Sequence, residues 1–572
     1  MAKICILTFY DKLCLGIRYL SSIARQQGHE ASLIFVKDPV VASSKNKPVS
    51  GKENLTYYNN CLHNGQTMSF GYDVEPWSNH EIKLLINQIE RIAPDIIGIS
   101  TRSFFTKFGT PVMRAIKEKF PNTPFVCGGF GPAFDPGWFL NWADYVVFGE
   151  YDSSIINLLD TVEKDGPLSE CNSLIFKDAD GNLSYNPVSG IESKLDKLPF
   201  PDWDDDNKYL IQYDRIAPGS RFQYREDYSL IAGRGCFGNC SYCMAWKWRD
   251  TYKKTYGLNV KKYRLRSPQN IIEELKKAKE QGARFCTFVD PVLTGPSEWV
   301  KELQDRYSDE IGLPFRANCH PLFTDDVTLK RLIEMGLKRT CVGIQSGSRR
   351  IRSLIFNRNV SDTSILNLCN MLDKHDVLYD VHLIGWNPYE TIEDYEKGLE
   401  FFLKLKSKTD LNVFRLQILP GSTLFNIQHS LTPAGLSEQV HLYYAYLFSF
   451  VFNNEKSRKF ALSVHESLAS INEKIFELIA GKEDLLAPSY IANAMPGMIF
   501  SSDTPRNRLI DSGFTNRNAK EITMDYDGNY ILDVLDSLEN KMQNSIFSEE
   551  DRMSFLAKSF IPKTAPNYLA HV

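Results

Sequence analysis

The chain has 572 residues, of which 43% are hydrophobic and 24% charged, and its net charge is −4. This composition is typical of a globular protein with several domains, and so weak a charge excludes a strong general attraction to nucleic acid or to an anionic membrane. The aromatic-rich run 442–452 is far shorter than the ~20 residues that cross a bilayer, and the N-terminus lacks the basic and apolar regions of a signal peptide. We therefore expect a soluble, cytoplasmic protein that binds neither nucleic acid nor membrane.

The first 165 residues alternate between apolar strands and amphipathic helices. Strands are predicted at 3–8, 30–35, 95–99, 124–127 and 144–148, helices at 15–27, 80–92, 111–120 and 153–162, and a polar loop at about 40–75. This α/β alternation indicates an open, parallel, doubly wound (Rossmann-like) domain over 1–165, and such sheets bind ligands at the carboxyl ends of their strands. We expect residues 166–225 to be a linker.

The alternation starts again after residue 226 with a different spacing. Strands are predicted at 228–232, 285–289, 313–317, 340–344, 380–384 and 413–419, and helices at 268–281, 325–335, 361–374 and 391–404. Six such units predict a partial (β/α)6 barrel over 226–430, with its chemistry at the strand carboxyl ends. We expect 431–572 to be a mainly helical region that caps the barrel and selects the substrate. Its aromatic residues are expected to be helix core rather than a substrate cage: Tyr443, Tyr444, Tyr446, Phe448 and Phe450.

Three of the twelve cysteines form a cluster, Cys236, Cys240 and Cys243, directly after a predicted strand. Three thiolates on one glycine-rich loop can hold three irons of a [4Fe–4S] cubane and leave the fourth iron open. A zinc knuckle or a ferredoxin centre would need a fourth ligand, and the next cysteine, Cys286, lies far away in a predicted strand. The other nine cysteines are single, as expected for free thiols in a reducing compartment.

The spacing Cys-x3-Cys-x2-Cys, with Tyr242 before the last cysteine, resembles the radical S-adenosylmethionine (SAM) superfamily. The resemblance implies that SAM binds the open iron and that the reduced cluster cleaves it to a 5′-deoxyadenosyl radical. It implies SAM contacts from Tyr242, from Asp290 at the end of the second barrel strand, from Gln345 and Ser346 in the segment GIQSGS, and from Asn387 in NPYET. Gln345 replaces the family's glutamate and so carries no charge. A low-potential electron donor of the flavodoxin or ferredoxin type is also implied.

The order of doubly wound domain, linker and barrel resembles the cobalamin-binding radical SAM enzymes over about 1–425. The segments that carry this resemblance are LGIRYL (15–20), PDIIGIS (94–100), VCGG (126–129) and VFGE (147–150). The cobalt-ligating pattern Asp-x-His-x-x-Gly is absent, so His29, His63 and His80 are expected to be ordinary histidines. The resemblance implies cobalamin contacts from Leu15, Gly16, Ser100, Gly128, Gly129, Gly149 and Glu150.

The function favoured by the sequence is a cobalamin-dependent radical SAM methyltransferase. In the family chemistry, a methyl group passes from methylcobalamin to an unactivated carbon, or phosphorus, of a natural product or peptide. Three alternatives stay open: the same cofactors with a cyclisation, ring contraction or oxidation, a radical SAM enzyme with a vestigial first domain, and a non-catalytic Fe–S redox sensor. No catalytic residue is assigned, and the candidates for proton or hydrogen handling at the barrel mouth are Tyr389, Glu390, His320 and His382.

Overall fold

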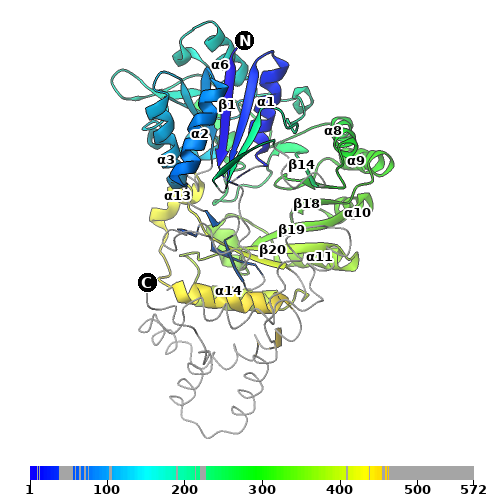
Figure 1. Ribbon diagram of the computed structural model, residues 1–572. Coiled ribbons are helices and arrows are strands. Elements are labelled where there is room, and N and C mark those ends of the chain that lie inside the picture. Colours follow the sequence, from blue (N-terminus) through cyan, green and yellow to red (C-terminus); the bar gives the residue numbers. More distant parts are fainter. Residues whose placement is uncertain are drawn as a thin grey trace.

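The computed structural model contains two stacked domains (Figure 1). It describes residues 1–9, 11, 13–37, 56–57, 60–63, 66–69, 73–74, 77–101, 106–188, 191–212, 214–219, 227–406, 410–436, 438–453, 458–459 and 462. Most of the predicted C-terminal helical region, from 463 onward, therefore lies outside the described residues. Within the described part, no helix is long and apolar enough to cross a membrane.

The first domain is built on a nine-stranded sheet. Its order from edge to edge is β11 (Leu183–Tyr185), β10 (Leu174–Lys177), β9 (Tyr145–Val147), β8 (Phe125–Gly128), β7 (Ile96–Ser100), β1 (Lys3–Phe9), β2 (Glu30–Val36), β12 (Lys208–Gln212) and β13 (Arg215–Pro218). The five predicted strands are the parallel centre, in the doubly wound order 2-1-3-4-5. The crevice where the order reverses therefore lies between the carboxyl ends of β1 and β7.

Two separate hydrophobic cores cover the two faces of this sheet. Along β1, Cys5 and Leu7 point into one core, whereas Ile4 and Ile6 point into the other, as the two-residue period of a strand requires. The helices divide between the faces, with α1 and α6 on one side and α2 and α3 on the other. The helices of this domain are α1 (Leu15–Gln26), α2 (Asn79–Ile92), α3 (Thr106–Lys119), α4 (Phe130–Phe134), α5 (Pro136–Phe139) and α6 (Ser154–Glu163).

The segment 166–225, expected to be a linker, contributes four strands to this sheet. β10 and β11 extend one edge antiparallel to β9, and β12 pairs in parallel with β2 before β13 turns back. These strands were missed because the pattern is weak: none of the three side chains of β11 and none of the four of β13 is buried. The first domain thus continues beyond residue 165.

The second domain contains the six predicted parallel strands, neighbours in chain order, which confirms the partial barrel (Figure 1). They are β14 (Asp227–Leu230), β17 (Phe285–Phe288), β18 (Phe315–Cys319), β19 (Leu337–Gln345), β20 (Leu378–Gly385) and β21 (Asp410–Arg415). The helices are α7 (Lys247–Tyr256), α8 (Pro268–Glu280), α9 (Ser297–Glu310), α10 (Asp326–Met335), α11 (Asp362–Lys374), α12 (Ile392–Phe402), α13 (Thr423–Ile427) and α14 (Glu438–Asn453).

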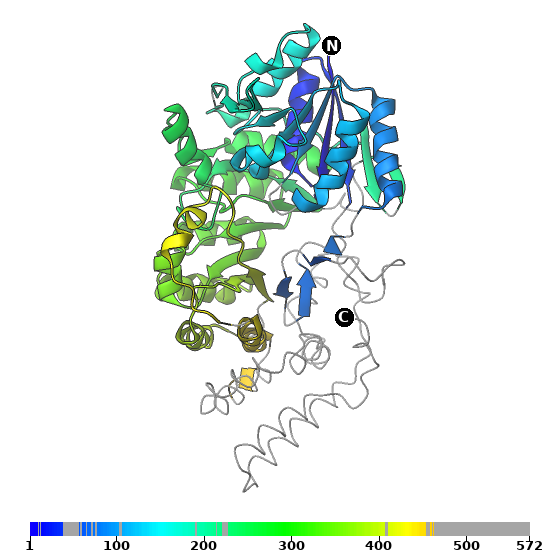
Figure 2. The ribbon, with the colours of Figure 1, turned by 90° about the vertical axis from the view of Figure 1, so that its left-hand side faces the viewer.

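The region 40–75, expected to be a polar loop, includes a hairpin that extends the barrel sheet. β4 (Asn60–His63) pairs antiparallel with β21, and β5 (Gln66–Ser69) pairs with β4. Two further short strands, β3 (Thr56–Tyr57) and β6 (Asp73–Val74), pair with each other. Figure 2 shows these blue strands below the first domain and beside the barrel. A segment of the first domain therefore closes the last edge of the second.

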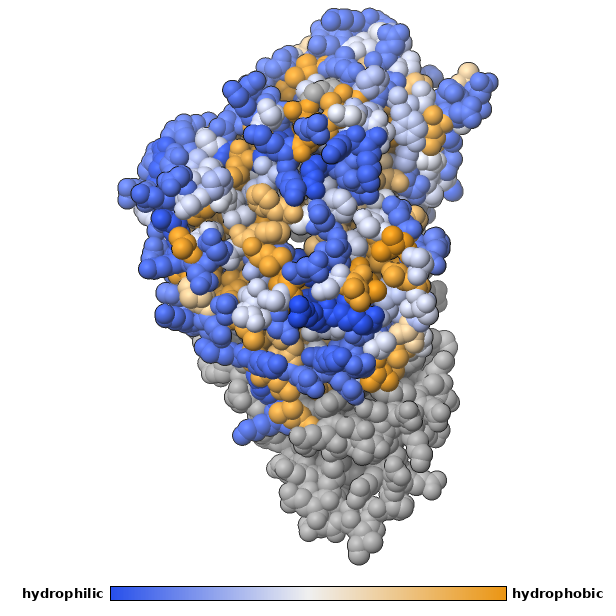
Figure 3. All heavy atoms as spheres, turned by 180° about the vertical axis from the view of Figure 1, so that it is seen from behind, coloured by the Kyte–Doolittle hydropathy of each residue, from blue (hydrophilic) through white to orange (hydrophobic). Residues whose placement is uncertain are grey.

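The carboxyl ends of the first sheet point toward the barrel. In Figure 1, β1 starts beside the N-terminus, far from the second domain, and runs toward it. Part of the contact between the domains is aromatic: Trp248 of α7 lies 5.3 Å from Phe130, 4.8 Å from Phe134 and 5.2 Å from Phe148, between ring centroids. The face seen from behind in Figure 3 is mostly hydrophilic, with apolar patches around a hollow at mid-height.

Candidate functional site

The cysteine loop, residues 236–243, follows the short strand β15 (Gly233–Gly235), which pairs with β16 (Tyr263–Leu265). A side chain at Gly235 would meet the carbonyl oxygen of Lys262 at 2.2 Å, and Gly235 has a φ of 106°. Only glycine allows this close approach of the two strands. The local sequence therefore fixes the start of the loop as a tight turn.

Backbone N–H groups in the loop point at two of the sulfurs. Gly238 donates to Sγ of Cys236 at 3.3 Å, and Ala245 donates to Sγ of Cys243 at 3.4 Å. Burial raises the pKa of the Cys243 thiol to about 11 and also raises the pKa of Cys236. Without iron these thiols stay protonated, and the N–H donors favour the thiolates that form when a metal replaces the proton.

The spacing of the three sulfurs argues against a single metal ion. With Zn–S bonds of about 2.3 Å, the ligand sulfurs of one zinc would lie within about 4 Å of each other. Among the described residues, the group of His, Cys, Asp and Glu ligand atoms within 4.8 Å of one another is His29, Asp160 and Glu163, which does not include the cysteines. Three thiolates spread more widely than this suit a cluster, with one sulfur for each of three irons.

The loop rests on a segment more than a hundred residues away. The Ser241 backbone donates to the carbonyl of Phe356 at 2.9 Å and its hydroxyl donates to that of Ile355 at 2.5 Å. The Phe356 ring packs against Tyr242 at 4.9 Å. Before this contact the chain forms a π-helical turn, Ile351–Ile355, and such turns are frequent at functional sites.

Arg358, which the sequence analysis missed, connects the cysteine loop to the end of β19. Its Nη1 donates to Sγ of Cys240 at 3.7 Å, and its Nη2 donates to the carbonyl of Gly343 at 2.6 Å. Its Nε is buried and has no hydrogen-bond partner among the described residues. Burial lowers the pKa of the Arg358 guanidinium. The interactions with Tyr242 and Cys240 raise it by more, so the pKa lies above its usual value. A positive charge therefore lies beside the cysteine loop, and its Nε–H group has no hydrogen-bond partner among the described residues.

Asp290 lies two residues after β17, close to the position predicted from the sequence, but its carboxylate is hydrogen-bonded to the chain that enters the cysteine loop. It accepts from the backbone of Ala232 at 2.8 Å and of Gly233 at 2.7 Å, and from the hydroxyl of Tyr263 at 3.1 Å. Complete burial raises the pKa of Asp290 to about 6. The role seen here is to position the loop, and contact with SAM stays a prediction.

The predicted SAM segment 345–348 leaves β19 through a strained residue. Gln345 has a φ of 73°, which is uncommon for a residue other than glycine and typical of functional turns. Gly347 then packs directly on Gly398 of α12, where a side chain would come within 2.3 Å of the Gly398 Cα. Arg352, fully buried, donates to the carbonyls of Ser346 and Gly347 at 2.8 Å each. The segment is therefore held rigidly at the barrel's carboxyl edge.

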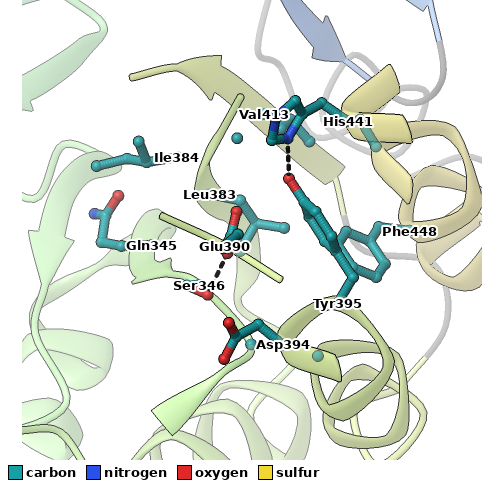
Figure 4. Close-up of a pocket in the computed structure, with 14 residues that line it drawn as sticks. Gln345, Ser346, Leu383, Ile384, Glu390, Asp394, Tyr395, Val413, His441 and Phe448 are labelled. Carbon is teal, nitrogen blue, oxygen red and sulfur yellow. Dashed lines mark hydrogen bonds between the residues drawn. The ribbon is translucent and has the colours of Figure 1, made fainter. Parts of the chain in front are cut away.

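Behind this segment lies a small pocket between β19, β20, β21, α12 and α14 (Figure 4). Ser346 donates to Glu390 at 2.7 Å, and Tyr395 is hydrogen-bonded to Nδ1 of His441 at 2.6 Å. The free space of about 20 Å³ admits only a water-sized molecule, so the pocket is no substrate cavity. Glu390, expected at the barrel mouth, is instead buried, with 4% of its surface exposed.

The other candidates suggested by the sequence are also mostly enclosed. Asn387 is fully buried, and its Nδ2 has no hydrogen-bond partner among the described residues. Burial, with Arg358 nearby, lowers the pKa of His320 to about 2, so this imidazole is neutral. His382 lies within β20 against the Phe414 ring at 5.0 Å, and Tyr389 belongs to a small apolar cluster. None of these positions by itself identifies a catalytic residue.

Of the predicted cobalamin residues, Leu15, Gly16 and Ser100 lie near the crevice of the first sheet. Leu15 and Gly16 begin α1, which follows β1, and Ser100 ends β7. Among the described residues, nothing lies within 4 Å of a side chain placed at Gly16. Ser100 faces the Cys14 sulfur, with 4.0 Å between Oγ and Sγ. These three residues therefore lie together at the strand carboxyl ends, and their contact with cobalamin stays a prediction.

The other predicted cobalamin residues contact protein. A side chain at Gly129 would meet the carbonyl of Thr101 at 2.4 Å, and one at Gly149 would meet the Tyr252 hydroxyl at 2.2 Å, whereas Gly128 packs on Val147. Both Gly129 and Gly149 have φ near +100°, which favours glycine. These glycines are therefore accounted for by the fold itself, and their contact with cobalamin stays a prediction.

Glu150 and Asp152 bind arginines of the second domain. Glu150 pairs with Nη1 of Arg234 at 2.9 Å and with Arg264, and its backbone N–H donates to Tyr252 at 2.7 Å. Arg234 also forms a two-bonded pair with Asp152. Arg234 stands two residues before Cys236, so the end of β9 is tied directly to the cluster loop.

Large apolar side chains are exposed at the strand ends of both domains. Leu13 follows β1 and Phe130 follows β8, whereas Phe237 lies in the cysteine loop, Val289 follows β17 and Leu322 follows β18. Between 37% and 48% of each side chain is accessible. Because the two carboxyl edges face each other, these residues border the space between the domains. Their exposure is compatible with a ligand that lies between the two edges.

Comparison with known proteins agrees with this geometry. Residues 230–402 match the family model of the radical SAM superfamily. The chain carries a radical SAM domain. The cobalamin-dependent radical SAM methyltransferase TokK of Streptomyces tokunonensis is 22% identical over 344 residues, which are 58% of this chain and 48% of TokK. The chain thus matches about half of the length of this relative.

Two solved structures share the fold over most of the chain. The cobalamin-dependent SAM radical enzyme OxsB, with aqua-cobalamin and SAM bound, has a TM-score of 0.57 and 13% identity, covering 98% of this chain and 83% of OxsB. The radical SAM methyltransferase TsrM of Kitasatospora setae has a TM-score of 0.53 and 14% identity, covering 74% of each chain. The family resemblance and the α/β fold class predicted from the sequence are confirmed.

Proposed function

We propose that this protein is a cobalamin-dependent radical SAM methyltransferase that acts on a small natural product or a peptide. The observation that carries the proposal is the pair of facing carboxyl edges, one with the cysteine loop and one with the open crevice at Leu15, Gly16 and Ser100. The exposed apolar residues along both edges suit a large, flat ligand such as a corrin.

Different residues of this chain would hold the cluster and bind SAM. Cys236, Cys240 and Cys243 would hold a [4Fe–4S] cluster, and the spare donor of Arg358 would take the SAM carboxylate. Gln345 and Ser346 would line the SAM site. Bound there, the cluster would supply the electron that generates a carbon radical from SAM, and cobalamin would supply the methyl group. The electron would come from a flavodoxin- or ferredoxin-type donor.

One anaerobic experiment tests the proposal. The protein is reconstituted with iron, sulfide and hydroxocobalamin, desalted, and given SAM and a low-potential reductant. We expect retained corrin absorbance together with 5′-deoxyadenosine and S-adenosylhomocysteine as products. The matched control is the variant in which all three cluster cysteines are Ala, which should retain corrin but form no deoxyadenosine. An iron–sulfur spectrum without corrin would overturn the cobalamin assignment, and corrin with deoxyadenosine as sole SAM product would favour a non-methylating reaction.

A further inference from the structure

Ser346 has an unusual setting for a residue at the edge of a ligand site. Only 3% of its surface is exposed, and its hydroxyl has two fixed partners: it donates to Oε1 of Glu390 and accepts from the backbone N–H of Ser348 at 3.2 Å. A hydroxyl with its proton committed to one carboxylate presents its remaining lone pair in a fixed direction. The orientation of Ser346 is therefore decided by Glu390.

Glu390 itself is held by the turn before α12. Its backbone N–H donates to the carbonyl of Asn387 at 3.1 Å. One turn later, Asp394 caps the helix at Thr391 and binds both Arg350 and Ser348, the latter at 2.6 Å. The α12 N-terminus is thus joined to the 346–350 segment by three contacts: Glu390 to Ser346, Asp394 to Ser348 and Asp394 to Arg350.

The same pocket connects α12 to the first helix of the C-terminal region. Tyr395 stacks on Tyr444 of α14 with ring centroids 4.5 Å apart and an interplanar angle of 6°, and its hydroxyl bonds to His441. Figure 4 shows Tyr395 reaching from α12 to His441, beside the Ser346–Glu390 pair. Both Tyr444 and His441 are buried, at 0% and 6% exposure. This contact is one of the links between the C-terminal region and the predicted SAM segment.

We propose that Glu390 is a positioning residue that fixes the Ser346 hydroxyl for SAM, and that the Tyr395–His441 bond locks α12, with Glu390, onto α14. This inference rests on the proposed binding of SAM at Ser346. It gives the first helix of the C-terminal region a role in SAM affinity, in addition to any role in choosing the substrate. We expect cluster assembly to depend on the cysteine loop and not on this chain of contacts.

A double-mutant cycle tests the main claim. The cluster-loaded protein is prepared with Glu390→Ala, with Ser346→Ala and with both changes, and the SAM dissociation constant is measured by equilibrium dialysis and by the SAM-induced change in the EPR signal of the reduced cluster. We expect each single variant to weaken SAM binding by about tenfold. The double variant should be no weaker than Ser346→Ala alone, because Glu390 acts through Ser346. Independent, multiplying losses would overturn the proposal.

Conservative and matched variants separate positioning from general damage. Glu390→Gln keeps an oxygen that accepts from Ser346, and it should restore affinity to within about threefold of the unchanged protein. Glu393→Gln alters an exposed carboxylate of the same turn, which pairs with Lys397 at the surface, and should leave the affinity for SAM unchanged. Tyr395→Phe should weaken SAM binding by a few fold without lowering the iron content. If Tyr395→Phe lowers the iron content instead, the contact between α12 and α14 is structural only.

A failure of this inference can be told apart from a failure of the proposed function. If none of the proteins, including the unchanged one, binds SAM, the proposed function itself is wrong.

Discussion

Arg234 and Asp152 form a two-bonded ion pair across the boundary between the two domains, with 3.1 Å between Nη2 and Oδ1. Only 18% of the arginine side chain and 8% of the aspartate side chain are exposed. Arg234 lies in β15, two residues before the first cluster cysteine, and Asp152 follows β9 of the first sheet. The ion pair therefore fixes the carboxyl end of β9 relative to the start of the cysteine loop.

The first prediction concerns this pair. Arg234→Met leaves the Asp152 carboxylate with little compensation in a poorly hydrated interface, and we expect it to lower the free energy of unfolding by about 3 kcal/mol. The added change Asp152→Asn should recover part of that loss. Thermal unfolding of the protein with its cofactors bound measures the stability of the single and of the double variant. Lys330→Met is the control, because its ion pair with Glu334 is exposed and 3.9 Å long, and should cost less than about 0.5 kcal/mol.

The second prediction separates the glycines that serve the fold from the one that borders open space. Gly149→Ala places a carbon 2.2 Å from the Tyr252 hydroxyl at a φ of 91°, and should destabilise the protein by about 2–4 kcal/mol. Gly16→Ala meets nothing within 4 Å and should leave the melting temperature unchanged. Gly16→Leu should also fold, yet retain less cobalamin after desalting. Unchanged corrin retention in Gly16→Leu would remove Gly16 from the site.

These glycines illustrate what could be predicted from the sequence and what could not. The parallel strands of both domains were predicted because buried strands are continuous apolar runs, and the cysteine triad because its ligands share one loop. A glycine at a strand end indicates that another group comes close to the backbone there. It does not show whether that group belongs to a ligand or to the protein. At Gly149 it is Tyr252, from 103 positions further along the chain, that fills the space.

Contacts with residues that are distant in sequence also explain why Arg358 and the strands of 166–225 were not predicted. Arg358 contacts Cys240 across 118 positions of sequence, and no local pattern distinguishes it from a surface arginine. The strands of 166–225 belong to a sheet whose other members are distant in sequence, and their alternation is too weak to stand out. Tertiary contacts of this kind are decided by the fold and not by the segment.

The third prediction follows from the charge of Arg358. Arg358 lies 3.7 Å from Cys240, and if Cys240 holds the proposed cluster, this cation stabilises the reduced, more negative form of the cluster. Arg358→Gln should therefore make the reduction potential of the cluster more negative by tens of millivolts, with normal iron content, as measured by an EPR-monitored redox titration. Arg306→Gln, at a partly exposed pair with Glu310, is the charge-matched control and should leave the potential unchanged. A potential that does not move in Arg358→Gln would contradict this role.

The fourth prediction concerns the pH dependence of stability at Glu390. Burial raises its pKa from 4.5 to about 8 and Asp394 adds to the rise, although the hydroxyls of Ser346 and Tyr395 favour the charged form. Arg350 also faces the carboxyl and favours its charged form, and His441 lines the same pocket. Because the folded state holds the proton more tightly than the unfolded state, this group's stabilising effect is complete below about pH 4.5. It is lost as the pH rises toward 8.

Between pH 6 and pH 8 this one group should cost the folded protein about 2 kcal/mol, because the slope of about 1.4 kcal/mol per pH unit falls off as the pH approaches the pKa of about 8. Glu390→Gln cannot ionise, so its melting temperature should fall less over that interval than that of the unchanged protein, by several degrees. Comparing the two proteins at each pH cancels the contributions of Asp227 and Asp290, whose pKa values burial raises to about 6. Parallel melting curves for the two proteins across the interval would mean that Glu390 is already ionised at pH 6. The Ser346 hydroxyl would then be held by a charged acceptor throughout, and the affinity for SAM should show no step near pH 8.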